Sequence, residues 1–107
     1  MTAYRVVLAE EAVDDLLRIE DFFIERELAG STPDLDVVHR LRDAVEHALR
    51  LLAFSPYSCR RAARGVNDRQ RELIIPFGSA GLVAAFEVRG EVVSIGAVRH
   101  QLELDGL

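Results

Sequence analysis

The sequence contains a single cysteine, Cys59, and neither tryptophan nor lysine. One cysteine excludes an internal disulfide and fits a reducing compartment. Three prolines and seven glycines are too few for a disordered or low-complexity protein. No apolar stretch approaches the roughly 20 residues that cross a bilayer, and the N-terminal residues lack the apolar run and cleavage site of a signal peptide. We therefore expect a soluble cytoplasmic protein without a membrane partner.

The chain is long enough for one domain and has enough hydrophobic residues to form a core. Half of its 107 residues are hydrophobic, and a domain of this size buries roughly 60–70% of the surface of its unfolded chain. A second domain would not fit within this length. We expect residues 1–107 to form a single domain.

The charges are distributed unevenly along the chain. A net charge of −5 argues against a generic nucleic-acid binder, which is usually basic. Residues 1–53 hold twelve acids and six arginines, whereas residues 54–107 hold six acids and seven arginines. Within 60–71, five arginines face one acid, Asp68. Because all thirteen basic residues are arginine, every cation can grip a carboxylate or phosphate in two places.

The first half of the chain predicts one strand followed by two helices. Residues 4–8 are rich in β-branched and aromatic side chains, which indicates a short strand. From Glu10 the apolar period becomes helical, with the stripe Ala12, Leu16, Ile19 and Phe23.

The second helix is predicted by a similar pattern. Thr32 is suited to the N-cap and Pro33 to the first helical position, and Ser55-Pro56 ends the helix. Its apolar stripe comprises Leu35, Val38, Leu41, Val45, Leu49 and Leu52. Two amphipathic helices joined by a short turn predict a helical hairpin with one apolar side.

The second half predicts strands. Residues 59–68 have no apolar period and indicate a basic loop. Strands are expected at 71–75, with Pro76 at the end, at 82–88 and at 91–98, and the turns between them are short and contain glycine. The expected fold is α+β with the order β-α-α-β-β-β, in which the helical hairpin packs on one face of an antiparallel sheet that includes the first strand.

Three runs of the sequence resemble the RelE/ParE toxin superfamily, nearest to its ParE, or plasmid-stabilisation, branch. They cover nearly the whole chain in the family's order. The first comprises 4–8, Ala12, 14–16 and 19–23, the second runs over 71–78 and through Gly81 to Phe86, and the third is 97–101.

The resemblance implies the toxin of a type II toxin–antitoxin system, neutralised by an antitoxin from an adjacent gene. For the ParE branch it implies growth inhibition by binding to DNA gyrase, with DNA contacted only through the antitoxin. The alternative is a ribosome-dependent mRNA endonuclease of the RelE type. Leu82, Phe86 and Leu107 stand where many relatives have tyrosine, which counts against RNA cleavage. A third possibility is a decayed toxin that only binds its antitoxin.

RNA cleavage of the RelE kind needs a base for the 2′-hydroxyl proton, cations around the phosphate and an acid for the leaving oxygen. The candidates for catalysis are Arg71, Arg99 and His100. Histidine side chains ordinarily titrate near neutrality, which suits His100 to acid or base chemistry. The favoured interpretation is a structural residue at a strand end, because no second acid or base accompanies it.

Several cations are candidates for contact with the target or the antitoxin. Arg60, Arg61 and Arg64 of the basic loop fit nucleic acid, an acidic antitoxin tail or plain solvated surface. The full set of contact candidates is Arg60, Arg61, Arg64, Arg71, Arg89, Arg99 and His100.

No pattern indicates a metal or cofactor. His39, Asp43 and His47 are four residues apart on the second predicted helix, but each step of four drifts by about 40°, so the outer two diverge. No further ligand completes a recognised zinc spacing. A lone Cys59 is expected to be a small packing residue rather than a nucleophile.

Overall fold

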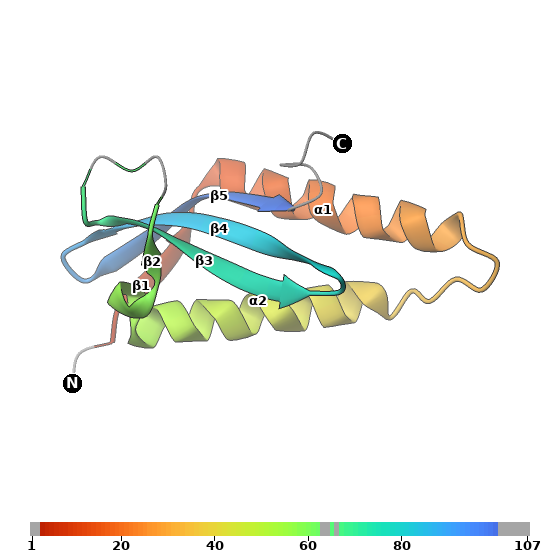
Figure 1. Cartoon of the computed structure of the whole chain (residues 1–107), viewed down its shortest axis with the longest axis horizontal. Helices are drawn as coiled ribbons and strands as arrows, with labels where there is room; N and C mark the ends of the chain where they lie inside the picture. The colour runs from red at the N-terminus through yellow and green to blue at the C-terminus, as the bar shows by residue number, and fades with distance from the viewer. Residues whose placement is uncertain (1–2, 63–64, 66, 101–107) are drawn as a thin grey trace.

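The computed structural model describes residues 3–62, 65 and 67–100 (Figure 1). Two helices and a five-stranded sheet form an elongated molecule in which the helical hairpin extends beyond the sheet at one end. The elements are β1 (Arg5–Leu8), α1 (Glu10–Leu28), α2 (Val37–Phe54), the 3₁₀ turn η1 (Pro56–Ser58), β2 (Arg60–Arg61), β3 (Gln70–Phe77), β4 (Ala80–Arg89) and β5 (Val92–His100). The expected α+β fold, with a helical hairpin on a sheet, is confirmed.

The sheet is mixed rather than fully antiparallel. Its strand order is β1-β5-β4-β3-β2, and β1 pairs parallel with β5, from Arg5 opposite Val92 to Leu8 opposite Ile95. The expectation of an antiparallel sheet holds for β2 to β5 and is wrong for β1. Sequence alternation predicts which face a side chain occupies, but strand direction depends on the long connection through both helices.

Both helices cover the same face of the sheet. α1 packs mainly over β5 and α2 over β3. The predicted stripe of α1 is confirmed, with Ala12, Ile19 and Phe23 buried and Leu16 half-buried. In α2, Leu41 and Leu52 are buried, whereas Leu35 lies before the helix and is exposed. The apolar sides of the strands and helices meet in one core.

The start of α2 was predicted too early. The helix begins at Val37 rather than at Pro33, and Asp36 occupies the N-cap position. The preceding turn is held by side chains: Glu27 Oε1 accepts the Asp34 N–H at 2.9 Å, and Asp34 Oδ1 accepts the Asp36 N–H at 3.0 Å. Such local hydrogen bonds offer the backbone an alternative to the helix, so Thr32 and Pro33 remain in the loop.

The strands differ from expectation at their ends. The predicted basic loop contains the short strand β2, which pairs only with Arg71 and Glu72 of β3. Pro76 lies inside β3 rather than at its end. Past Glu72, no strand in the described part of the chain pairs with the outer side of β3, and such an edge tolerates a proline because no N–H is needed there. Gly78 and Gly90 have positive φ in the turns that were predicted to contain glycine. Glycine adopts this conformation readily because it has no Cβ.

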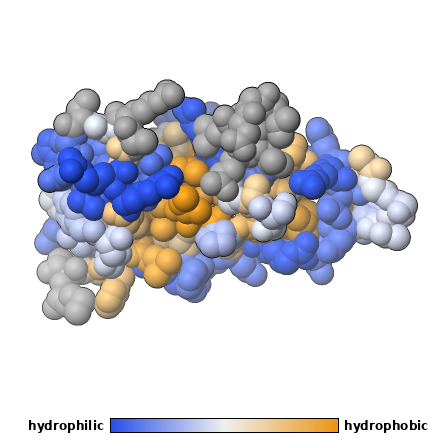
Figure 2. Space-filling model, in the orientation of Figure 1, coloured by the Kyte–Doolittle hydropathy of each residue, from blue (hydrophilic) through white to orange (hydrophobic). Residues whose placement is uncertain are grey.

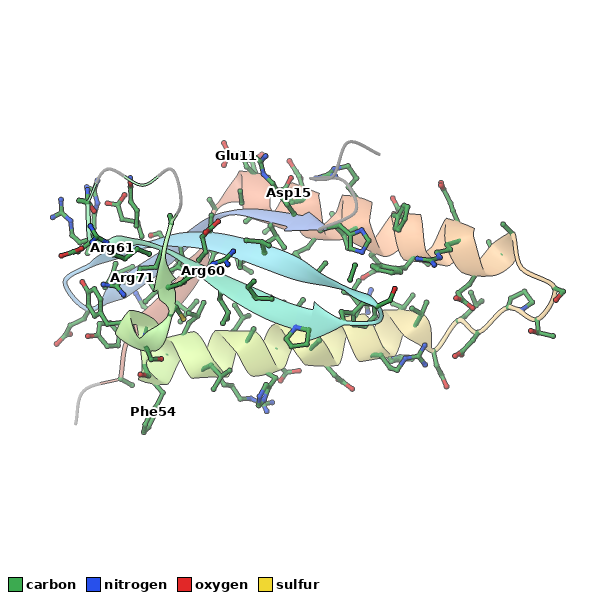
Figure 3. The ribbon with its side chains drawn as sticks, viewed as in Figure 1. Glu11, Asp15, Phe54, Arg60, Arg61 and Arg71 are labelled. Carbon is green, nitrogen blue, oxygen red and sulfur yellow. The ribbon has the colours of Figure 1, made fainter. Side chains whose placement is uncertain are left out.

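Asp15 of α1 closes the opposite part of the sheet, next to β5. β1 ends opposite Ile95, so beyond that point no strand among the described residues pairs with the outer edge of β5. Asp15 Oδ2 accepts the Val98 N–H at 2.9 Å (Figure 3). A helix carboxylate thus replaces a missing strand.

We expect Asp15→Ala to lower the free energy of unfolding by about 1–2 kcal/mol, because a hydrogen bond to a charged group is lost and Val98 N–H loses its acceptor. Urea denaturation measures the loss. Asp14→Ala is the matched control, since Asp14 is exposed and its replacement should change stability by less than about 0.5 kcal/mol. Equal effects of the two replacements would refute the role of Asp15.

Neither helix in the described part of the chain is both long and apolar enough to pass through a bilayer.

Candidate functional site

The predicted site residues lie at two ends of the sheet. One end carries Arg60 and Arg61, which form β2, and Arg71 near the start of β3 (Figure 3). His100 ends β5 and lies opposite Leu82, at the far end of β4. Arg64 is outside the described residues. The candidates therefore do not form one cluster.

Arg71 is engaged by the backbone around it. Its Nε donates to the Asp68 carbonyl at 2.8 Å, and its Nη1 donates to the carbonyls of Cys59 and Tyr57 at 2.8 and 3.2 Å. The guanidinium also stacks on the Tyr57 ring, 5.0 Å from the centroid. Arg71 thereby links β3 to η1, to Cys59 just before β2 and to Asp68 after β2. Most of its N–H groups are engaged in these hydrogen bonds.

The two arginines of β2 remain accessible. Arg60 pairs with Glu72 at 3.4 Å and Arg61 with Asp68 at 2.9 Å, and both arginine side chains are more than half exposed. The Arg61–Asp68 pair is exposed on both sides, and such pairs contribute about 0–1 kcal/mol, so a ligand can displace it at little cost. Figure 2 shows the hydrophilic surface at this end of the molecule.

Arg89 and Arg99 lie apart from each other and from β2. Arg89 is exposed at the end of β4 and donates a hydrogen bond to the Glu87 carboxylate, which lowers the pKa of Glu87. Arg99 is exposed on β5 opposite Val83. It forms no ion pair with any residue that the structure describes.

His100 is buried in the core rather than open to a large substrate. Its side chain is 1% exposed, and its ring lies 5.3 Å from the ring of Phe22 and 5.1 Å from that of Phe23. Successive residues of a strand face opposite sides of a sheet, so Arg99 faces away from the helices while His100 faces them.

The three catalytic candidates are not brought together. Arg71 lies opposite Phe86 and His100 opposite Leu82. Four residues along a strand span about 13 Å, and the two side chains also come from strands on either side of β4. This arrangement suits separate binding contacts better than concerted acid–base chemistry.

Cys59 and the residues considered for metal binding occupy ordinary positions. Cys59 is half-buried; burial raises the pKa of its thiol, and the nearby Arg71 offsets part of that rise. A raised pKa disfavours the reactive thiolate at neutral pH. His39, Asp43 and His47 are all exposed on α2. Within the described ranges, no three potential ligands of these types converge.

Two adjoining hollows were not indicated by the sequence patterns. The edge groove, about 230 Å³, lies between α2 and the outer edge of β3 and is lined by Ala44, His47, Ala48, Leu51, Leu73, Ile74, Ile75 and Pro76. The basic hollow, about 500 Å³, lies where both helices approach the β3–β4 turn and is lined by Phe23, Arg26, Glu27, Val37, Arg40, Ala44, Pro76, Phe77, Gly78, Ser79, Ala80 and His100.

Two arginines of the basic hollow went unrecognised in the sequence. Arg26 follows the buried Phe23 by three residues, and Arg40 follows the buried Val37 by three. On a helix, that spacing places each arginine at the rim of the apolar side. The spacing was visible in the sequence, but their meeting in one hollow depends on how the hairpin folds.

A third hollow, the hairpin groove, separates the two helices. It measures about 220 Å³ and is lined by Leu16, Glu20, Leu41, Arg42, Val45, Glu46 and Leu49. Arg42 bridges it by donating two hydrogen bonds to Glu20, at 3.0 and 3.1 Å. The lining between these charged groups is mostly apolar.

The comparisons with known proteins identify the fold. No protein-family model matches the chain, and no curated protein matches it significantly. Among solved structures, a chain described under "Chromosomal ParDE TA system from P. aeruginosa" superposes with a TM-score of 0.68. It is 15% identical, and the match covers 92% of this chain and 96% of the other. The chain thus has the RelE/ParE-like fold seen in a ParDE toxin–antitoxin structure.

Proposed function

We propose that this protein is the toxin of a type II toxin–antitoxin system, acts in the cytoplasm as one domain, and is neutralised by a cognate antitoxin. The observation that carries this proposal is the match in fold over nearly the full length of both chains. The ParE-like sequence runs support the same assignment, including the 14–16 run that contains the structural Asp15.

The unpartnered apolar surface supports an antitoxin partner. Val13, Leu17 and Leu28 of α1 are 41%, 55% and 60% exposed, and Phe54 at the end of α2 is 67% exposed and points away from the sheet (Figure 3). Val13 and Leu17 are four residues apart and therefore share one face of α1, and a contiguous exposed apolar surface commonly marks a protein interface. An antitoxin that covers it would stabilise the toxin by binding only its folded state.

We further propose that the toxin inhibits growth by binding DNA gyrase and contacts DNA only through its antitoxin. The dispersed cations support binding rather than catalysis: Arg60, Arg61 and Arg99 are accessible, Arg71 is occupied by backbone carbonyls, and His100 is enclosed by aromatic rings. Like other ParE-branch proteins, it would then contribute to plasmid stabilisation.

The test is gyrase supercoiling with the purified chain. We expect excess toxin to block supercoiling and the charge-reversing pair Arg60→Glu and Arg61→Glu to weaken the block. Arg50→Glu is the control, since Arg50 is an exposed cation of α2 paired with Glu46. Unimpaired gyrase at excess folded toxin would eliminate gyrase as the target.

A RelE-type mRNA endonuclease is the second candidate. It is favoured by one observation: Arg60 and Arg99 lie on the face of the sheet that the helices leave open, where nucleic acid has access. Cleavage of mRNA on translating ribosomes measures it. Cuts by the parent chain that vanish in Arg99→Ala would establish this activity, and an absence of cuts would reject it.

A further inference from the structure

The edge groove and the basic hollow form one continuous trough. Ala44 of α2 and Pro76 of β3 line both of them. The trough follows the outer edge of β3, where β2 pairs only with Arg71 and Glu72, and no other strand of the described residues pairs with Leu73 to Phe77 on that side. A bare strand edge beside a groove is the setting in which an extended peptide can add to a sheet.

The two ends of the trough differ in chemistry. At the edge-groove end, Leu51, Leu73 and Ile74 offer apolar contacts, and Leu51 and Ile74 are 49% and 38% exposed. This end suits a bulky apolar side chain; its lining includes His47 but no arginine.

The other end has two arginines over an aromatic floor and one acid, Glu27, whose carboxylate accepts the Asp34 N–H. Arg26 from α1 and Arg40 from α2 reach the same hollow above Phe23 and Phe77, whose rings lie 5.0 Å apart. Arg40 pairs with Asp34, but both side chains are more than half exposed, so this pair is readily exchanged. Arg26 has no ion pair with any described residue. Two forked guanidinium groups at one rim favour a carboxylate.

We propose that this trough binds an extended segment of a partner protein that has a bulky apolar residue at one end and an aspartate or glutamate at the other. The inference rests on the proposed function in that the antitoxin is the expected source of the segment. Leu73 and Phe77 mark the two ends of the trough, so the two anchoring residues stand about four positions apart in an extended chain.

The shape and charge of the trough favour a peptide over other occupants. It is elongated, runs beside backbone groups of β3 that pair with no described strand, and confines its arginines to one end. A nucleic acid would need cations spaced along its phosphates, and the apolar end has no arginine. Arg26 and Arg40 therefore determine specificity by their charge.

The test is selection from a displayed library of random twelve-residue peptides against the purified full chain. We expect enriched peptides to share an apolar residue and an acid about four positions apart. Binding should fall by on the order of tenfold in the Arg26→Glu/Arg40→Glu double variant, and selection on that variant should enrich lysine or arginine in place of the acid. The neutral Arg26→Gln/Arg40→Gln variant should lose the acid preference.

The control variant is Arg50→Glu, which reverses an exposed charge of α2 outside the trough. It should leave the consensus and the affinities unchanged. The proposal is overturned if no peptide is enriched, if the consensus lacks an acid, or if the double variant with an unchanged circular dichroism spectrum selects the same peptides. Gyrase inhibition is measured without any peptide, so failure of the proposed function is recognised separately.

Discussion

Replacing Arg71 with alanine is expected to lower the free energy of unfolding by about 2–4 kcal/mol. The guanidinium donates to the carbonyls of Tyr57, Cys59 and Asp68 and stacks on the Tyr57 ring. Hydrogen bonds from a charged donor contribute about 1.5–3 kcal/mol each, though not additively. Urea denaturation followed by circular dichroism measures the loss, and amide exchange in β2 should rise with it.

Arg69→Ala is the matched control for this prediction. Arg69 is a neighbouring exposed arginine whose side chain makes none of these carbonyl contacts, so its removal should cost less than about 0.5 kcal/mol. A variant lacking Arg71 that is as stable as the Arg69 variant would show that the carbonyl contacts do not hold the β2 segment.

Phe23→Ala should have an even larger effect, about 3–5 kcal/mol, because it opens a cavity at the junction of three elements. Phe23 is 8% exposed and its ring contacts those of Phe22, Phe77 and His100. It thereby joins α1 to β3 and to the end of β5. Thermal and urea denaturation both report the loss.

Replacement of the neighbouring Phe22 is the matched control, because Phe22 is also aromatic but is less buried. It contacts the same histidine ring but is 37% exposed, so Phe22→Ala should cost only about 1 kcal/mol. If the two alanine variants were equally stable, the described packing at this end of the core would be incorrect.

The elements with strong local signals were predictable from the sequence. The stripe of α1 is set by the helical period, and the turns at Gly78 and Gly90 are set by backbone conformations that favour glycine. The start of α2 was not predictable from residue types. The carboxylates of Glu27 and Asp34 accept hydrogen bonds from backbone N–H groups of the preceding loop, and these bonds keep that loop out of the helix. β2 and the direction of β1 depend on partners far along the chain.

The candidate site was less predictable than the fold. The sequence indicated Arg71 only as a cation. Its structural role depends on the carbonyls of Tyr57 and Cys59, whose position near Arg71 does not follow from residue type. The expected strand ended at residue 98, whereas β5 continues to His100, so the positions of Arg99 and His100 on opposite faces of the sheet were not predicted. The meeting of Arg26 and Arg40 required the tertiary arrangement of the hairpin, since they lie on different helices.

The proposed function, a toxin restrained by a partner protein, can be tested by the growth of bacteria that express the chain from an inducible promoter, alone or together with the neighbouring open reading frame. We expect growth arrest in the first case and normal growth in the second. Undiminished growth of cells that accumulate the folded chain alone would contradict it.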